Sequence, residues 1–243
     1  MIRLDQYLYE FGYCRSRSLA AKLIRAGYVL VDGKECTKPS EKISPDAQID
    51  ICENPLDRYV SRGGLKLEAA LKEFGVDPKG AMCIDIGAST GGFTDCLLRH
   101  GARKVYAIDS GTGQLHPSLQ SDPRVISMEN TNARFLDEGM VPVTHLVVMD
   151  VSFISQSLLY PAVTKVLAPG GIYISLIKPQ FEVGRDGIGS GGIVKSEKLR
   201  LECIEALRKA GEKYGLIMKA TITSPITGGD GNTEYLALFQ KEQ

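Results

Sequence analysis

Two short helices are predicted at the start of the chain from the spacing of their apolar residues. The first carries apolar side chains at the i, i+3, i+4 and i+7 positions of one helix face, namely Leu4, Tyr7, Leu8 and Phe11. Gly12 is a suitable end for it. The second helix can begin at Ser16 or Ser18, because either side chain can cap it, and it can end at Gly27. Its buried face is expected to consist of Ala20, Leu23 and Ile24.

The segment that follows these helices has the pattern of a β-hairpin. Residues 28–36 are rich in β-branched and apolar side chains, and Asp32-Gly33 in their middle suits a two-residue type I′ turn. A further strand is expected at Gln48–Ile51. We therefore predict a small α+β domain over residues 1–56, followed by a linker at residues 57–62.

The rest of the chain alternates apolar runs with amphipathic segments. After Gly63-Gly64, one helix is predicted from its apolar face of Leu67, Ala70, Leu71 and Phe74. Strands are predicted at Met82–Ile86, Lys104–Ile108, Arg124–Met128, His145–Met149, Ile172–Ile177, Leu216–Thr223 and Glu234–Phe239. Further helices are predicted at Thr90–His100, Gln156–Leu167 and Glu197–Tyr214. This order is typical of an α/β fold with a mostly parallel seven-stranded sheet between two layers of helices, here over residues 63–243. A loop joins the last two strands, so we expect them to be antiparallel.

Composition narrows the function classes only a little. The 243 residues are 43% hydrophobic and 24% charged, and 29 basic residues balance 29 acidic ones, so affinity for nucleic acid would have to come from a local patch. The six cysteines and three histidines are scattered, which indicates neither a disulfide framework nor a metal site. No apolar run approaches the ~20 residues of a membrane span. A cytoplasmic protein without a metal and without a membrane partner is expected.

Such a basic patch is predicted in the N-terminal domain. Between Tyr13 and Arg25 the chain has four cations and no acid. A solvated helix face would explain this as well. However, the order of helix, basic helix, glycine and hairpin resembles the alpha-L RNA-binding module, which occurs in a ribosomal protein and in pseudouridine synthases. The resemblance implies contacts to RNA phosphates from Arg3, Arg15, Arg17, Lys22 and Arg25.

A glycine-rich turn follows the first predicted strand of the second domain. The segment has the form Gly87-x-x-x-Gly91-Gly92, not the G-x-G-x-x-G of dinucleotide-binding proteins, so NAD is disfavoured. Asp109 ends the next strand, where a carboxylate can accept both hydroxyl protons of a ribose. A tight turn without a ligand is the alternative. The combination resembles the S-adenosylmethionine-binding motifs of class I methyltransferases. That resemblance implies a cofactor site made by Asp85, Gly87, Ala88, Ser89, Gly91, Gly92, Phe93 and Asp109, with Asn130 and Asn132 near the adenine.

Four charged residues are expected at one edge of the sheet. Asp150 and Lys178 end the fourth and fifth strands, Lys66 precedes the first, and Glu234 begins the last. Alone, each would be interpreted as a surface charge or an ion pair. Together they resemble the Lys-Asp-Lys-Glu set of FtsJ-type ribose 2′-O-methyltransferases, and nearly the whole chain resembles the TlyA family. The segments that carry this resemblance are 59–66 (YVSRGGLK), 150–155 (DVSFIS) and 178–182 (KPQFE).

The family resemblance implies methylation of a cytidine 2′-hydroxyl in ribosomal RNA, with ribosomal RNA or a ribosomal subunit as the partner. Lys178 would remove the hydroxyl proton, while Lys66, Asp150 and Glu234 position the reacting groups. The glycine-rich stretches at Gly184–Gly192 and Gly228–Gly231 are either lids or plain surface loops. Three alternatives remain open: an RNA-binding protein without catalysis, a membrane-active haemolysin as the family's label suggests, and a base methyltransferase. The last typically has an Asn/Asp-Pro-Pro-aromatic motif where this chain has Asp150-Val-Ser-Phe.

Overall fold

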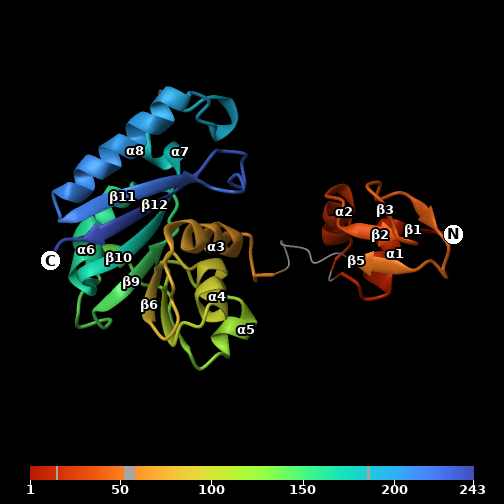
Figure 1. Ribbon diagram of the computed structural model, residues 1–243, viewed down its shortest axis with the longest axis horizontal. Coiled ribbons are helices and arrows are strands. Elements are labelled where there is room, and N and C mark those ends of the chain that lie inside the picture. Colours follow the sequence, from red (N-terminus) through yellow and green to blue (C-terminus); the bar gives the residue numbers. More distant parts are fainter. Residues whose placement is uncertain (15, 52–57, 185–186) are drawn as a thin grey trace. The chain divides into compact units, whose positions relative to one another are not determined.

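The chain divides into two compact units, Met1–Arg58 and Tyr59–Gln243, in the computed structural model shown in Figure 1. The structure describes residues 1–14, 16–51, 58–184 and 187–243. Across these ranges, no helix combines the length and the apolar character needed to cross a membrane. Each unit has its own hydrophobic core, so the two are described separately.

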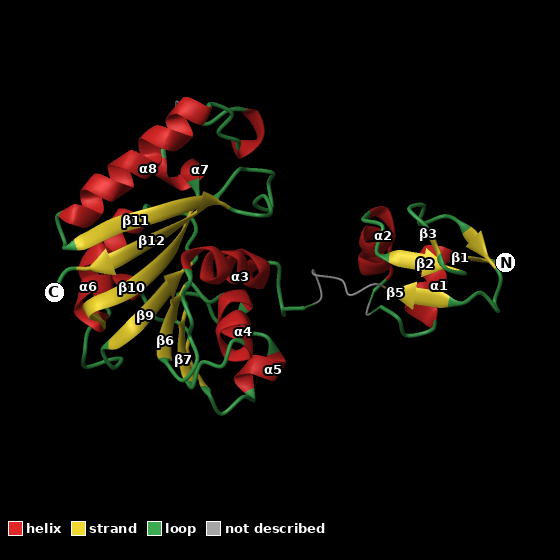
Figure 2. Cartoon of the chain, in the orientation of Figure 1, coloured by secondary structure: helices red, strands yellow, loops and turns green. Residues whose placement is uncertain are grey.

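The N-terminal unit packs two helices on short antiparallel strands (Figure 2). Its elements are β1 (Ile2–Arg3), α1 (Leu4–Glu10), α2 (Arg17–Arg25), β2 (Val29–Val31), β3 (Lys34–Glu35), β4 (Lys42–Ile43) and β5 (Ile49–Ile51). Strand β2 lies between β3 and β5, and β1 pairs with β4. Ser16 caps α2 by accepting a hydrogen bond from the Leu19 amide at 3.2 Å. Of the two serines considered from the sequence, Ser16 is therefore the cap.

The predicted hairpin turn is confirmed by its backbone angles. Asp32 and Gly33 have φ values of +51° and +74°, as a type I′ turn requires at both central positions. One predicted core residue is wrong. Phe11 is 55% exposed, because α1 ends at Glu10 and the chain turns before the fourth position of the apolar face. Its ring stacks on Tyr7 with a centroid distance of 4.3 Å.

The C-terminal unit is built on a seven-stranded sheet in the order β11-β12-β10-β9-β6-β7-β8. The strands are β6 (Met82–Ile86), β7 (Lys104–Ile108), β8 (Val125–Met128), β9 (Thr144–Met149), β10 (Leu167–Ile177), β11 (Leu216–Thr223) and β12 (Tyr235–Lys241). Strand β12 runs antiparallel to both β10 and β11, and the other pairings are parallel. The predicted α/β fold and its antiparallel ending are confirmed.

Helices cover both faces of this sheet (Figure 1). They are α3 (Gly63–Phe74), α4 (Gly92–Arg99), α5 (Pro117–Gln120), α6 (Tyr160–Val166), α7 (Pro179–Glu182) and α8 (Glu197–Glu212), with short 3₁₀ turns η2 (Ala133–Phe135), η3 (Gln156–Leu159) and η5 (Ser190–Gly192). Ile84 and Ile86 of β6 pack in the core with α6 and α8, while Cys83 packs in the core with α3 and α4. Alternate residues of a strand point to opposite faces, so the two cores lie on opposite sides of the sheet.

Several predicted boundaries differ from the structure, most by one or two residues. The helix expected at 156–167 is split into η3 and α6, and Pro161 lies in the first turn of α6, where its missing amide proton costs nothing. Strand β10 begins at Leu167, five residues before the expected start. Its pairing with β9 is irregular between Leu167 and Ile172, and the apolar run used for the prediction begins only after that irregularity. Glu234 lies one residue before β12 and does not begin that strand.

Candidate active site

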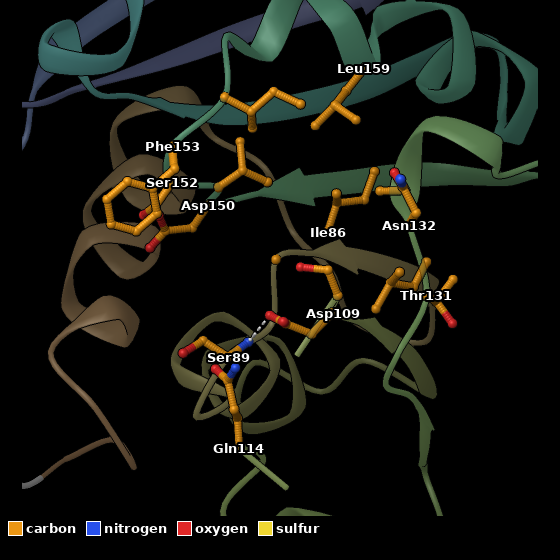
Figure 3. Close-up of a pocket in the computed structure, with 16 residues that line it drawn as sticks. Ile86, Ser89, Asp109, Gln114, Thr131, Asn132, Asp150, Ser152, Phe153 and Leu159 are labelled. Atoms are coloured by element: carbon orange, nitrogen blue, oxygen red, sulfur yellow. Dashed lines mark hydrogen bonds between the residues drawn. The ribbon is translucent and has the colours of Figure 1, made fainter. Parts of the chain in front are cut away.

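A cavity of about 350 Å³ lies over the carboxyl ends of β6, β7 and β9. Figure 3 shows Asp109 and Asp150 on two sides of it, with Ser89, Asn132 and Phe153 also lining it. Small-molecule sites in proteins measure ~300–1,000 Å³, so this cavity can hold a nucleoside-sized ligand. Its place at the ends of parallel strands is where open α/β sheets bind ligands.

The glycine turn after β6 lets two loops approach closely beneath the cavity. Gly87 has a φ of +82°, and a Cβ there would lie 2.3 Å from the Asp150 carbonyl oxygen. The amides of Gly87 and Ala88 both donate to the Ile108 carbonyl, at 2.8 and 3.0 Å. Only glycine fits this position without strain, and the turn therefore holds the ends of β6, β7 and β9 together.

Asp109 is fixed at the cavity wall by backbone donors. Its Oδ2 accepts a hydrogen bond from the Ser89 amide at 2.8 Å (Figure 3), and its Oδ1 accepts one from the Gly111 amide at 2.7 Å. Each carboxylate oxygen retains a second lone pair for a ligand. The position can therefore accept hydrogen bonds from the two hydroxyls of a ribose.

Not all the residues predicted for the cofactor site line this cavity. Those that do are Gly87, Ser89, Asp109 and Asn132. Ala88 and Phe93 are buried, and a Cβ on Gly91 would meet Leu119 at 2.2 Å, so these positions support the turn from below. Gly92 has the same role, because its own Cβ would lie 2.3 Å from Ser61. Asn130 adopts a φ of +53° in the loop after β8 and is not among the lining residues.

Sequence reasoning missed several lining residues. They are Ser110, Gln114, Thr131 and the run Val151–Ile154, together with apolar residues from neighbouring elements. Phe153 is the most distinctive, since its side chain is 91% exposed and its φ is +64°. The ring lies 5.0 Å from that of Phe181. An exposed aromatic residue in a strained backbone conformation is a functional signal, but the alternation of apolar residues in the sequence does not reveal it.

Asp85 is buried beneath the glycine turn, outside the cavity. It is fully buried, its Oδ2 accepts a hydrogen bond from Thr94 Oγ1 at 2.7 Å, and its Oδ1 accepts none from the described residues. Burial raises the pKa of this carboxyl to about 7, although the Thr94 hydrogen bond acts in the opposite direction. The charges of Asp150 and Asp109 are smaller contributions to the same rise in pKa.

The four charged residues predicted to act together form two ion pairs. Lys178 Nζ lies 2.6 Å from Asp150 Oδ1 and donates to Ser152 Oγ at 2.8 Å. Lys66 Nζ pairs with Glu234 Oε2, and both residues are buried. The sequence placed Lys66 away from the apolar face of α3, and its burial is explained by this partner.

Strand register places the two pairs at the same edge of the sheet. Ile177 of β10 is the antiparallel partner of Tyr235 of β12. Lys178 directly follows the first and Glu234 directly precedes the second, so the two residues lie at the same end of this strand pair. Asp150 ends β9, which is the other neighbour of β10. Three strand ends and the start of α3 therefore bring a Lys, an Asp, a second Lys and a Glu to one edge of the sheet, and of these four residues Asp150 lines the cavity.

The two glycine-rich loops beside this edge are connected to each other. Asn232 is buried, donates from Nδ2 to the Gly192 carbonyl at 2.9 Å, and accepts from the Val194 amide at 3.0 Å. A Cβ on Gly228 would lie 2.6 Å from Glu234 Oε1. The loops thus contact each other and Glu234, and their role as lids stays a prediction.

The basic residues of the N-terminal unit are partly neutralised by an acid from another helix. Asp5 of α1 accepts from Arg3 Nε at 3.0 Å and from Arg17 at 3.3 Å. The Arg3 guanidinium, with a smaller contribution from Arg17, lowers the pKa of the Asp5 carboxyl. Asp5 therefore neutralises part of the positive charge expected for α2. The charge count over residues 13–25 did not include this acid, because Asp5 lies outside that segment. Lys22 and Arg25 are exposed, and Arg15 lies outside the described residues.

A seven-stranded sheet whose last strand, β12, lies antiparallel between β10 and β11, with a cavity over the ends of β6 and β7, is the architecture of the class I methyltransferases. The chain belongs to the FtsJ-like methyltransferase family, whose model matches residues 59–241. The N-terminal unit also matches a second family model, that of the S4 domain, over residues 2–49.

The matches to named relatives extend over nearly the whole chain. Hemolysin A of Brachyspira hyodysenteriae is 44% identical over 241 residues, which are 98% of this chain and 99% of that protein. The 16S/23S rRNA (cytidine-2′-O)-methyltransferase TlyA of Mycobacterium tuberculosis is 41% identical over 234 residues, 96% of this chain and 87% of that protein. A solved structure from Streptococcus thermophilus, labelled a candidate hemolysin, has a TM-score of 0.77 and 41% identity and covers 100% of this chain and 89% of its own.

Proposed function

We propose that this chain methylates the 2′-hydroxyl of a cytidine in ribosomal RNA, using S-adenosylmethionine as the methyl donor. Residues 63–243 would carry the chemistry, residues 1–56 would bind the RNA, and residues 57–62 would link the two. The observation that carries the proposal is the pair of Lys-acid contacts, Lys178 with Asp150 and Lys66 with Glu234, beside the cavity. The name of the mycobacterial relative supports the substrate.

The size of the cavity and the hydrogen-bonding groups that line it suit S-adenosylmethionine. Asp109 can accept hydrogen bonds from the ribose hydroxyls, and Asn132 offers an amide to the adenine side. Gly87 allows the backbone to approach a ligand without a side chain between them. When bound, S-adenosylmethionine supplies an electrophilic methyl group on its sulfonium.

The charged residues would activate and align the ribose hydroxyl. Oxygen must lose its proton as it bonds to the methyl carbon, and Lys178, in its neutral form, is the group placed to take that proton. Asp150 forms an ion pair with the lysine amine at 2.6 Å, and the hydrogen bond that the amine donates to Ser152 at 2.8 Å gives it a direction. Lys66 and Glu234 form a second, buried pair that stabilises the start of β12 at the same edge.

The RNA would be bound by exposed cations of the N-terminal unit and by one exposed aromatic ring of the C-terminal unit. Lys22 and Arg25 offer charges to phosphates, and the basic helix needs no base contacts to bind RNA by shape. At the cavity mouth, the ring of Phe153 is available to stack on an unpaired base. The charges of Arg3 and Arg17 are shared with Asp5, so we expect them to contribute less.

Lys178→Arg tests the proposal, because a guanidinium can keep the ion pair with Asp150 but cannot accept a proton. We expect single-turnover methyl transfer to ribosomal RNA to fall ~10²–10⁴-fold in both Lys178→Arg and Lys178→Ala, with cofactor affinity unchanged. Lys213→Arg, at the exposed end of α8, is the matched control. Near-normal transfer by Lys178→Arg would remove Lys178 as the base.

The same assay separates the competing functions. Digestion of the product to nucleosides followed by mass spectrometry places the methyl group on the ribose or on the base. Ribose methylation that requires Lys178 supports the proposal, and base methylation contradicts it. Absence of transfer to any ribosomal RNA would favour a binding protein without catalysis, or the membrane activity that the labels of some relatives suggest.

A further inference from the structure

Two short segments lie against each other along one side of the cavity. The first, residues 150–156, follows β9, and the second, residues 178–182, consists of Lys178 and α7. Near their starts, Lys178 contacts Asp150 and Ser152. Further along, the ring of Phe181 lies 5.0 Å from that of Phe153. The segment that carries the proposed base therefore contacts the segment that carries its partners at two successive places.

Glu182 makes the last of these contacts. Its Oε2 accepts a hydrogen bond from Ser155 Oγ at 2.6 Å, and its Oε1 accepts one from the Gln156 amide at 2.9 Å. Ser155 and Gln156 are the N-cap and first residue of η3, where free amides favour a carboxylate. One side chain of α7 therefore holds the beginning of η3 at two points.

The contact continues into the sheet through buried polar groups. Gln156 is 1% exposed, and its Oε1 accepts a hydrogen bond from Ser175 Oγ of β10. Its side chain is also within 3.5 Å of the Tyr173 hydroxyl. Burial raises the pKa of Glu182, and the two hydrogen bonds that it accepts oppose that effect. Burying a carboxyl group costs free energy, and the two hydrogen bonds that Glu182 accepts offset part of that cost.

We infer that Glu182 is a positioning residue that fixes segment 150–156 against α7, so that Asp150 and Ser152 hold Lys178 in line with the ribose hydroxyl. The inference rests on the proposed function, because it assigns Glu182 a role through Lys178. It goes beyond the Lys-Asp-Lys-Glu set, which does not include this glutamate. Glu182 accepts its hydrogen bonds from Ser155 and Gln156, so its effect on Lys178 is indirect.

A positioning role predicts a loss of rate with little loss of cofactor affinity. The opposite wall of the cavity, with Asp109 held by Ser89 and Gly111, does not depend on Glu182. Misplacement of a reacting group by about 1 Å can cost ~10²-fold in rate. We therefore expect Glu182→Ala to lower single-turnover methyl transfer about 10- to 100-fold and to change cofactor affinity less than about threefold.

Two further variants separate positioning from folding. Glu182→Gln keeps an oxygen for the Gln156 amide, so it should retain transfer within about threefold of the wild type. Thr144→Val is the stability control: it removes a partly buried hydrogen bond from Thr144 Oγ1 to the Met82 carbonyl at the far end of β9. Six residues of strand place that bond about 20 Å from Asp150. It should lower the melting temperature without lowering the transfer rate.

The decisive measurement is a double-mutant cycle between Glu182→Ala and Lys178→Ala at saturating RNA and cofactor. If Glu182 acts through Lys178, its loss should cost less than about threefold once Lys178 is gone. A full additive loss in that background would overturn the inference, as would normal transfer by Glu182→Ala or an equal loss in Thr144→Val. If the wild-type chain transfers no methyl group to RNA, the proposed function fails instead.

Discussion

Replacing Asp85 with asparagine should make the pH dependence of stability less steep, because this carboxyl is buried in an environment that disfavours its charge. Burial raises its pKa to about 7, from an ordinary value of 3.8. A carboxyl with a raised folded-state pKa favours folding most at pH below 3.8, where it is protonated in both states. That contribution is lost progressively as the pH rises towards 7.

The size of the effect follows from the shift. Roughly three pKa units at 1.36 kcal/mol each amount to about 4 kcal/mol at pH 7 and above. Asparagine can accept the Thr94 hydrogen bond and carries no charge. Relative to the wild type, the free energy of unfolding of Asp85→Asn should therefore increase between pH 4 and pH 8 by up to about 4 kcal/mol.

Urea unfolding followed by circular dichroism at several pH values measures this difference, with the transition of the C-terminal unit fitted separately. Asp77→Asn, at an exposed position in the loop after α3, is the matched control for the substitution itself. The carboxyl carbon of Asp85, followed by NMR, should titrate with a midpoint near 7. A difference between Asp85→Asn and the wild type that stays constant from pH 4 to pH 8 would refute the argument.

Two other predictions concern the ligands. Asp109→Asn should weaken S-adenosylmethionine binding by tenfold or more, roughly 1.5 kcal/mol, because a charged acceptor is lost; calorimetry measures it, and unchanged affinity would place the ribose elsewhere. Combined Lys22→Ala and Arg25→Ala should weaken binding to ribosomal RNA and reduce the slope of log affinity against log salt by about 2, which filter binding can determine. An unchanged slope would mean that α2 does not contact phosphates.

The sheet could be predicted from the sequence because its central strands are buried on both faces. Such strands appear as continuous apolar runs, and the predicted bounds of β6 and β7 coincide with the structure. Polar contacts between distant segments carry no comparable pattern. The pairing of Arg17 with Asp5 and the contact of Glu182 with Ser155 depend on side chains that come together only after folding. The sequence therefore did not predict these contacts.

The placement of Glu234 shows how one topological prediction determines part of the chemistry. In a parallel sheet, the residues that meet at the ligand edge follow their strands, as Asp150 and Lys178 do. A residue that precedes a strand would lie at the opposite edge unless that strand runs the other way. Because β12 is antiparallel to β10, with Tyr235 opposite Ile177, Glu234 is carried to the edge of Lys178 and meets Lys66 from α3. The loop between the last two strands, which predicted their antiparallel pairing, therefore also accounts for the fourth member of the charged set.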